Sequence, residues 1–297
     1  MLIEQAFHNL PEILLGSGYA KQDYQKGFEA SIVAAFSLAV LQELNGRNAA
    51  NPISYLMAEK RYPDVDEKIR ADLYVNLSRL FTGSESYANF GFRFCNWIEA
   101  KYFRRTGGTP PNTQNLGSIV ADLFRLVVLL PKEEHERAGR YFLHIYRGDP
   151  LKEKLIKAER DDQAKTKRDW VTKLLSAGDH VIDDIELAKE VPWKSFFTHL
   201  GAGFDTATCK LGITNYKLIP AHREKEDSYT LVLTRIDSAV FKFKGKTLTI
   251  TADRKVVCDP ADKLEELRKE VASTLKPKKP RKPRAKKAAK KAAPATK

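Results

Sequence analysis

The sequence predicts a mixed α/β fold, with a central mixed β-sheet flanked by helices, and three stretches of the chain carry that prediction. Residues 68–77 alternate between apolar and polar side chains, which is the period of a half-buried strand. The aromatic-rich run at 94–98 is typical of a buried strand. From 116 to 130, apolar residues recur at helical spacing until Pro131. These elements fit a sheet with helices packed against it.

The first helix of this predicted core runs from Asp23 to about Leu44. Asp23 is suited to cap the amino end of the helix, and Asn45-Gly46 is suited to close it. Residues 1–22 indicate a leading segment or a short helix. Residues 47–67 indicate a helical or loop connection to the first strand.

The later elements follow the same reasoning. Residues 82–92 are polar and contain glycine, so they can connect two paired strands, and 140–146 indicate another core strand. After residue 150 the composition changes. The elements predicted there are a charged helix in 151–175, a helix in 181–200 near Trp193, strands at 229–233, 240–243 and 247–251, the last two as a hairpin, and a final helix opened by Asp259-Pro260.

Charged residues interrupt two of the predicted strands. Asp72 lies midway along 68–77, and Glu99 and Lys101 are two residues apart in the next strand, which places them on one face. Burying such groups costs several kcal/mol unless they are paired. Two carboxylates on neighbouring strands suit a hard divalent cation. In the structural alternative, Asp72 binds Arg70 or Arg93, and Glu99 pairs with Lys101 or another neighbour.

Asp72 on one strand and Glu99-Ala100-Lys101 on the next resemble the PD-(D/E)XK nuclease superfamily, which includes many restriction and repair endonucleases. The resemblance covers roughly residues 24–147. It implies that Asp72 and Glu99 bind Mg²⁺, with the Ala100 carbonyl as a further ligand, and that Lys101 orients or activates the attacking water. Glu29 resembles a glutamate that many members carry on the preceding helix. The alternative for Glu29 is an edge residue whose carboxylate reaches water.

The chain departs from the motif in one respect, because Ala71 rather than proline precedes Asp72. Pro63-Asp64 matches the first half of the motif literally, but it lies in a predicted turn. Proline is disfavoured in a central strand, so Asp72 is the preferred candidate and Asp64 its rival.

The net charge of +13 is concentrated at the carboxyl end of the chain. From Lys276 onward there are 11 Lys and Arg residues and no acids, which leaves 40 basic against 38 acidic residues elsewhere. Such a segment lacks apolar residues for a core, so it is expected to be disordered. It resembles linker-histone-like tails, which bind DNA through charge; the alternative is a solubility tail or a general polyanion binder. The DNA-contacting cations that we expect are Arg104, Arg105, Lys278, Lys279, Arg281, Lys282, Arg284, Lys286 and Lys287.

Other kinds of site receive little support. Three separated cysteines form neither a disulfide framework nor a zinc cluster, and the six histidines show no metal-ligand spacing. No stretch approaches 18 apolar residues and the amino end lacks signal-peptide features, so we expect no membrane span and a cytoplasmic, nucleoid-associated protein.

These observations predict three parts: a restriction-endonuclease-like core at 1–150, an α+β extension or second subdomain at 151–275, and the basic tail at 276–297. The predicted function is a Mg²⁺-dependent DNA endonuclease of the restriction or defence type. The alternative is a non-catalytic DNA-binding or nucleoid-associated protein on a nuclease-like scaffold. An RNA-directed nuclease and a homodimer also stay open.

Overall fold

The computed structural model describes residues 2–16, 28–63, 69–81, 93–103, 112–148, 150, 162–189, 193–200, 204–219 and 229–274. The helices are α1 (Leu2–Gly16), α2 (Phe28–Gly46), α4 (Asn112–Val128), α5 (Asp162–Leu175), α6 (Lys194–Leu200) and α7 (Lys263–Thr274). The strands are β1 (Leu56–Arg61), β2 (Arg70–Asn76), β3 (Cys95–Phe103), β4 (Ala138–Arg147), β5 (Gly178–Ala188), β6 (Thr206–Leu218), β7 (Tyr229–Phe243), β8 (Lys246–Ile250) and β9 (Val256–Asp259). The predicted mixed α/β fold with a central mixed sheet is confirmed.

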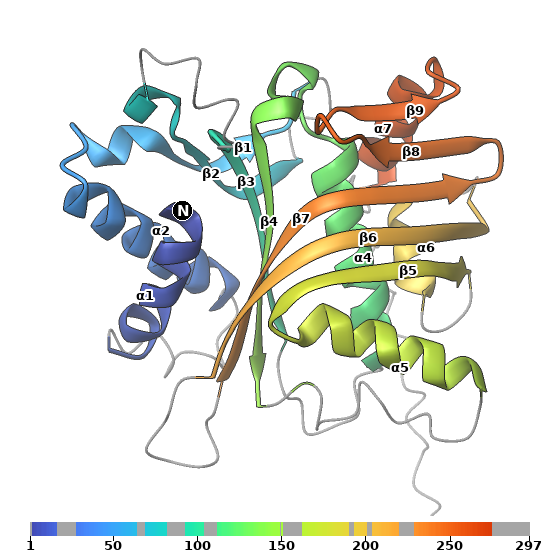
Figure 1. Cartoon of the computed structure of the whole chain (residues 1–297), viewed down its shortest axis with the longest axis horizontal. Coiled ribbons are helices and arrows are strands. Elements are labelled where there is room, and N and C mark those ends of the chain that lie inside the picture. The colour runs from blue at the N-terminus through green and yellow to red at the C-terminus, as the bar shows by residue number, and fades with distance from the viewer. Residues whose placement is uncertain are drawn as a thin grey trace, which may run out of the picture.

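Strands from both halves of the chain belong to one sheet. In the described residues it has nine strands, in the order β1-β2-β3-β4-β7-β6-β5, while β8 pairs with β7 and β9 with β8. The β3–β4 pair is parallel, and the other pairs are antiparallel. Because β4 pairs with β7, the strands after residue 151 continue the sheet that the first half begins (Figure 1).

The two faces of the sheet bury different helices. Along β3, Ile98 packs in the cluster that contains α1 and α2, whereas Trp97 packs in the cluster that contains α4. This alternation is the two-residue period of a strand. In Figure 1, α1 and α2 lie together on one side of the molecule, and α4 passes behind β5, β6 and β7.

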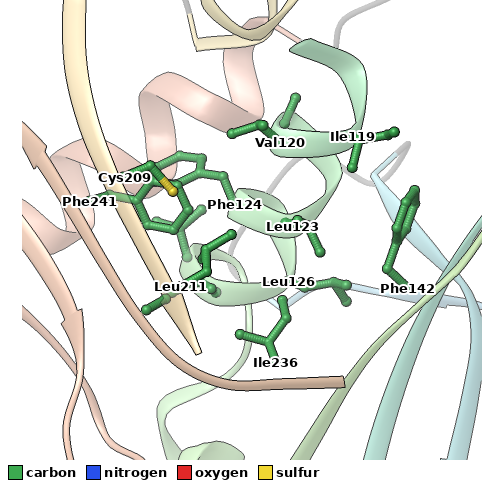
Figure 2. Packing of buried hydrophobic residues seen from close by; sticks show 14 of the residues in the cluster. Ile119, Val120, Leu123, Phe124, Leu126, Phe142, Cys209, Leu211, Ile236 and Phe241 are labelled. Carbon is green, nitrogen blue, oxygen red and sulfur yellow. The ribbon is translucent and has the colours of Figure 1, made fainter. Parts of the chain in front are cut away.

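Helix α4 is the centre of the larger core. Its side chains meet β6 and β7, as Figure 2 shows for Phe124 beside Leu211 and Phe241. The Phe124 and Phe241 rings meet edge to face, with centroids 4.8 Å apart. Burial of each such side chain contributes about 1.5–3 kcal/mol, so α4 ties both parts of the sheet together.

The prediction for residues 47–67 was wrong in part, because they contain β1. This strand lies at the edge of the sheet, and its residues 56–61 are half-buried or exposed. A strand with little burial on either face carries no apolar alternation, which explains why the pattern did not indicate it.

Three other predictions need correction. The helix near Trp193 is α6, but 178–188 form β5, in which a register shift places buried Ile182 and Ile185 three residues apart, as in a helix. Residues 229–243 form one strand rather than two. The last helix begins at Lys263, since Asp259 still pairs with Thr247 in the sheet. The predicted hairpin of β7 and β8 is confirmed.

Candidate functional site

Strands β2 and β3 separate in the middle of the sheet. Their pairing runs from Asn76 and Cys95 to Leu73 and Ile98 and then stops. Beyond that point β2 continues beside β1, and β3 continues beside β4. We call this divergence the fork. The next residues on the two strands are Asp72 and Glu99, so two predicted metal ligands lie where the fork opens.

Carboxylates replace the missing strand along the open edge of β3. The Ala100 N–H donates to Asp72 Oδ2 at 2.7 Å, and the Tyr102 N–H donates to Glu29 Oε2 at 3.3 Å. The N–H and C=O groups of one strand residue point toward the same neighbour. The Ala100 carbonyl, the third predicted metal ligand, is therefore directed into the fork.

Lys101 completes the group of predicted residues. Its Nζ lies 3.9 Å from Glu29 Oε2, and both side chains are 40% exposed. The fork thus brings together side chains from α2, β2 and β3. Arg70 and Arg93, the structural partners considered for Asp72, instead bind Glu59 at 2.6 Å and Asp237 at 2.5 Å.

Glu99 is buried and is held from the α4 side. Its Oε1 accepts hydrogen bonds from the Tyr62 hydroxyl at 2.8 Å and from Arg125 Nη2 at 3.1 Å. Arg125 also binds Asp122 at 2.9 Å. The sequence analysis did not identify Tyr62, Arg125 or Asp122 as members of this site. A signal was present, because Asp122 and Arg125 form an i,i+3 charge pair on a helix whose other face is apolar.

The fork holds more negative than positive charge. Its described members are four carboxylates, from Glu29, Asp72, Glu99 and Asp122, and two cations, from Lys101 and Arg125. The pKa of Glu99 is raised to about 8, mainly by burial and to a lesser degree by Asp72 and Asp122, while Arg125 opposes this rise. The pKa of Asp72 is also raised, mainly by burial and then by Glu29, while the Ala100 N–H opposes this rise. A bound divalent cation would relieve this excess of negative charge.

The backbone of β1 is strained beside Asp72. Ala58 pairs with Leu73 and Lys60 with Ala71, so Glu59 lies at the register position opposite Asp72. Glu59 has φ 52°, a left-handed conformation that costs a non-glycine residue about 1–3 kcal/mol. Such strain clusters at functional sites, and here it coincides with the fork.

The donor set fits Mg²⁺, which prefers oxygen ligands. Among the described residues, no group of three His, Cys, Asp or Glu side chains lies close enough to hold a metal ion. Mg²⁺ is usually bound by one or two carboxylates and keeps several waters. The carboxylates of Asp72 and Glu99 and the carbonyl of Ala100 are therefore a sufficient set of the right chemistry.

Several predicted residues lie outside the part of the chain that the structure describes. They are Asp23, Asp64, Arg104, Arg105 and the basic segment 276–297, with Lys278, Lys279, Arg281, Lys282, Arg284, Lys286 and Lys287. Their roles stay predictions from the sequence.

No protein-family model, curated protein or solved structure matches this chain. None of the helices in the described ranges is long and apolar enough to cross a membrane.

Proposed function

We propose that this chain is a Mg²⁺-dependent DNA endonuclease of the PD-(D/E)XK type. The observation that carries the proposal is the fork, where Glu29, Asp72 and the run Glu99-Ala100-Lys101 meet at a break in the sheet. The order α2, β1, β2, β3, α4, β4, with β3 parallel to β4, supports it as well. A restriction or defence role in a cytoplasmic, nucleoid-associated setting follows only by analogy with the superfamily.

The residues of the fork would bind the metal ion, position the attacking water and hold Lys101 in place. Asp72, Glu99 and the Ala100 carbonyl would hold Mg²⁺, which when bound polarises a phosphoryl oxygen and lowers the pKa of a coordinated water. Lys101 would position the attacking water and stabilise charge on the phosphorus centre. Glu29, 3.9 Å from Lys101, would hold that ammonium group in place.

Tyr62 and Arg125 would orient the Glu99 carboxylate. Within the described residues, both hydrogen bonds to this carboxylate fall on Oε1. Oε2 is then the atom left to face a cation. Arg125 also keeps Glu99 partly compensated when no metal is bound, which limits the cost of a buried negative charge.

Plasmid cleavage tests the chemistry. Asp72→Asn keeps an oxygen acceptor for the Ala100 N–H but removes the charge, so it separates the metal role from the structural one. Supercoiled plasmid should be nicked by wild type in Mg²⁺ and not in EDTA, while Asp72→Asn and Lys101→Met lower the rate at least about 100-fold. Asp183→Asn, an exposed aspartate on β5, is the control and should cut normally. Cleavage that survives EDTA or Asp72→Asn removes this mechanism.

The second candidate is a non-catalytic DNA-binding or nucleoid-associated protein on the same scaffold. The contacts of Glu99 with Tyr62 and Arg125 favour it, because they already satisfy a buried carboxylate without a metal. It predicts salt-sensitive DNA retention that is lost on deletion of 276–297, with no cutting in any divalent metal. A third hypothesis is an RNA-directed nuclease. Cleavage assays with DNA and RNA substrates in parallel distinguish it from a DNA endonuclease.

A further inference from the structure

A second charged cluster lies at the start of β4 and centres on Arg140. This guanidinium is only 2% exposed. Its Nη2 donates to the backbone carbonyls of His135 and Arg254, at 3.5 and 3.4 Å, and among the described residues its Nε has no partner. Both hydrogen bonds are long for a charged donor, for which 2.7–2.9 Å is usual. Within the described residues, Arg140 is therefore a buried cation with two long hydrogen bonds and an unpaired Nε.

The groups around Arg140 add positive charge. Burial and, to a lesser degree, the positive charges of Arg93 and Arg254 lower the pKa of Arg140 to about 9. In the described residues no carboxylate forms an ion pair with Arg140. Asp237, which acts on Arg254, already binds Arg93 at 2.5 Å and Arg235 at 2.9 Å. A buried cation without a counter-ion costs several kcal/mol, and a bound anion would offset that cost.

Two of these arginines give the cluster access to solvent. The side chain of Arg93 is 14% exposed, and Arg254 is half-buried in the turn between β8 and β9. That turn lies beside the start of β4 (Figure 1), and the Arg254 carbonyl accepts from Arg140. Arg93 and Arg254 lie close enough to act on the charge of Arg140, so an anion held by these two would also be attracted by Arg140.

We propose that Arg93, Arg140 and Arg254 form a binding site for a phosphate group, either free or carried by a nucleic acid. Guanidinium groups match the oxygens of phosphate in geometry and keep their charge when buried. The site stands whether or not the fork cuts DNA, because its residues and its ligand do not depend on Asp72 or Glu99.

Phosphate-dependent thermal unfolding of the full chain tests the site. Inorganic phosphate is titrated at constant ionic strength, with chloride as the balancing anion. Wild type should show a saturable rise in Tm, and Arg140→Met should bind phosphate at least about tenfold more weakly. The matched control is Arg268→Met, which removes an arginine of equal burial that has a carboxylate partner, Glu265, at 3.3 Å. This control should keep the phosphate response of wild type.

A second variant tests the site independently of whether Arg140→Met folds. Arg254→Asn removes a cation from a turn position with φ 65°, a conformation that asparagine tolerates, and it should weaken phosphate binding as well. Competition with a short DNA duplex identifies the source of the phosphate. If Arg140→Met also weakens duplex binding, the site takes nucleic-acid phosphate; if only the phosphate response is lost, it takes the free ion. An equal rise in Tm with chloride alone, or an unchanged phosphate response in both variants, overturns the proposal.

Discussion

At the residue scale, the buried carboxylate of Glu99 governs how the fork responds to pH. Burial raises its pKa from an ordinary 4.5 to about 8. Between these values the folded chain binds more protons than the unfolded chain does. The contribution of Glu99 to stability is therefore complete below pH 4.5 and is lost as pH rises through 8.

Glu99→Gln should flatten the pH dependence of stability. One proton of difference gives a slope on the order of 1 kcal/mol per pH unit in the free energy of unfolding, and glutamine cannot titrate. Urea unfolding at pH 5, 6, 7 and 8 measures the slope. Glu266→Gln is the control: its lowered pKa of about 2 lies, like its ordinary value, below this window, so the wild-type slope should persist. Equal slopes in wild type and Glu99→Gln would contradict the raised pKa.

Arg125 should matter to stability through Glu99. Arg125→Met removes the cation that binds the buried carboxyl groups of Glu99 and Asp122, which costs up to about 3–5 kcal/mol where both are ionised. In the double variant with Glu99→Gln, the part of that loss that belongs to Glu99 should disappear, while the part that belongs to Asp122, which Arg125 also binds, should stay. A double-mutant cycle by urea unfolding at pH 8 measures the coupling. Additive losses would mean that Arg125 acts through Asp122 alone.

Residue patterns allowed the charged groups of the fork to be predicted but not their partners. Asp72, Glu99 and Lys101 stood out because strands rarely carry such groups, and that signal is local in sequence. Tyr62 and Arg125 lie 37 and 26 residues from Glu99, so only the fold brings them to it.

At the element scale, strands were predictable where one face is buried. In β2 the alternation follows from Leu73 and Val75, which share one face and pack with α1 and α2, whereas β1 has no buried face and β5 carries a bulge. The fork forms because β2 continues beside β1 while β3 continues beside β4. The residue pattern of a single strand does not reveal such a separation. Register and divergence depend on neighbours distant in sequence.

The kink in β1 gives a test at this scale. Glu59 adopts φ 52°, so asparagine should be tolerated within about 0.5 kcal/mol, whereas valine should cost about 1–2 kcal/mol. Valine would be favoured in a regular exposed strand, so the sign of its effect reports the kink. Thermal unfolding of Glu59→Asn and Glu59→Val measures it. The paired variant Ala58→Val, at an exposed position of ordinary conformation in the same strand, should show no such penalty.

At the scale of the whole molecule, two charged regions of opposite sign lie along the same strands. The fork has excess carboxylates, and the arginine cluster around Arg140 has excess cations. Arg140 pairs with Trp97 in the parallel register of β3 and β4, two residues before Glu99. A polyanion drawn to the arginines would therefore be brought close to the carboxylates, which need a divalent cation before they can accept it.

The basic segment from Lys276 onward should add affinity without adding chemistry. If about half of its 11 cations neutralise phosphates, deletion of 276–297 should reduce the slope of log affinity against log salt by roughly 4–5. A slope of this size means that the contribution of the segment to DNA affinity falls by about a few hundred-fold when salt rises from 50 to 200 mM. DNA binding measured at four salt concentrations gives the slope. Replacing the 11 cations with glutamine at unchanged length is the control and should reproduce the deletion.

Under the nuclease proposal, the cleavage rate at saturating DNA should be unchanged while KM rises. A fall in the saturated rate would instead place the segment at the reacting phosphate.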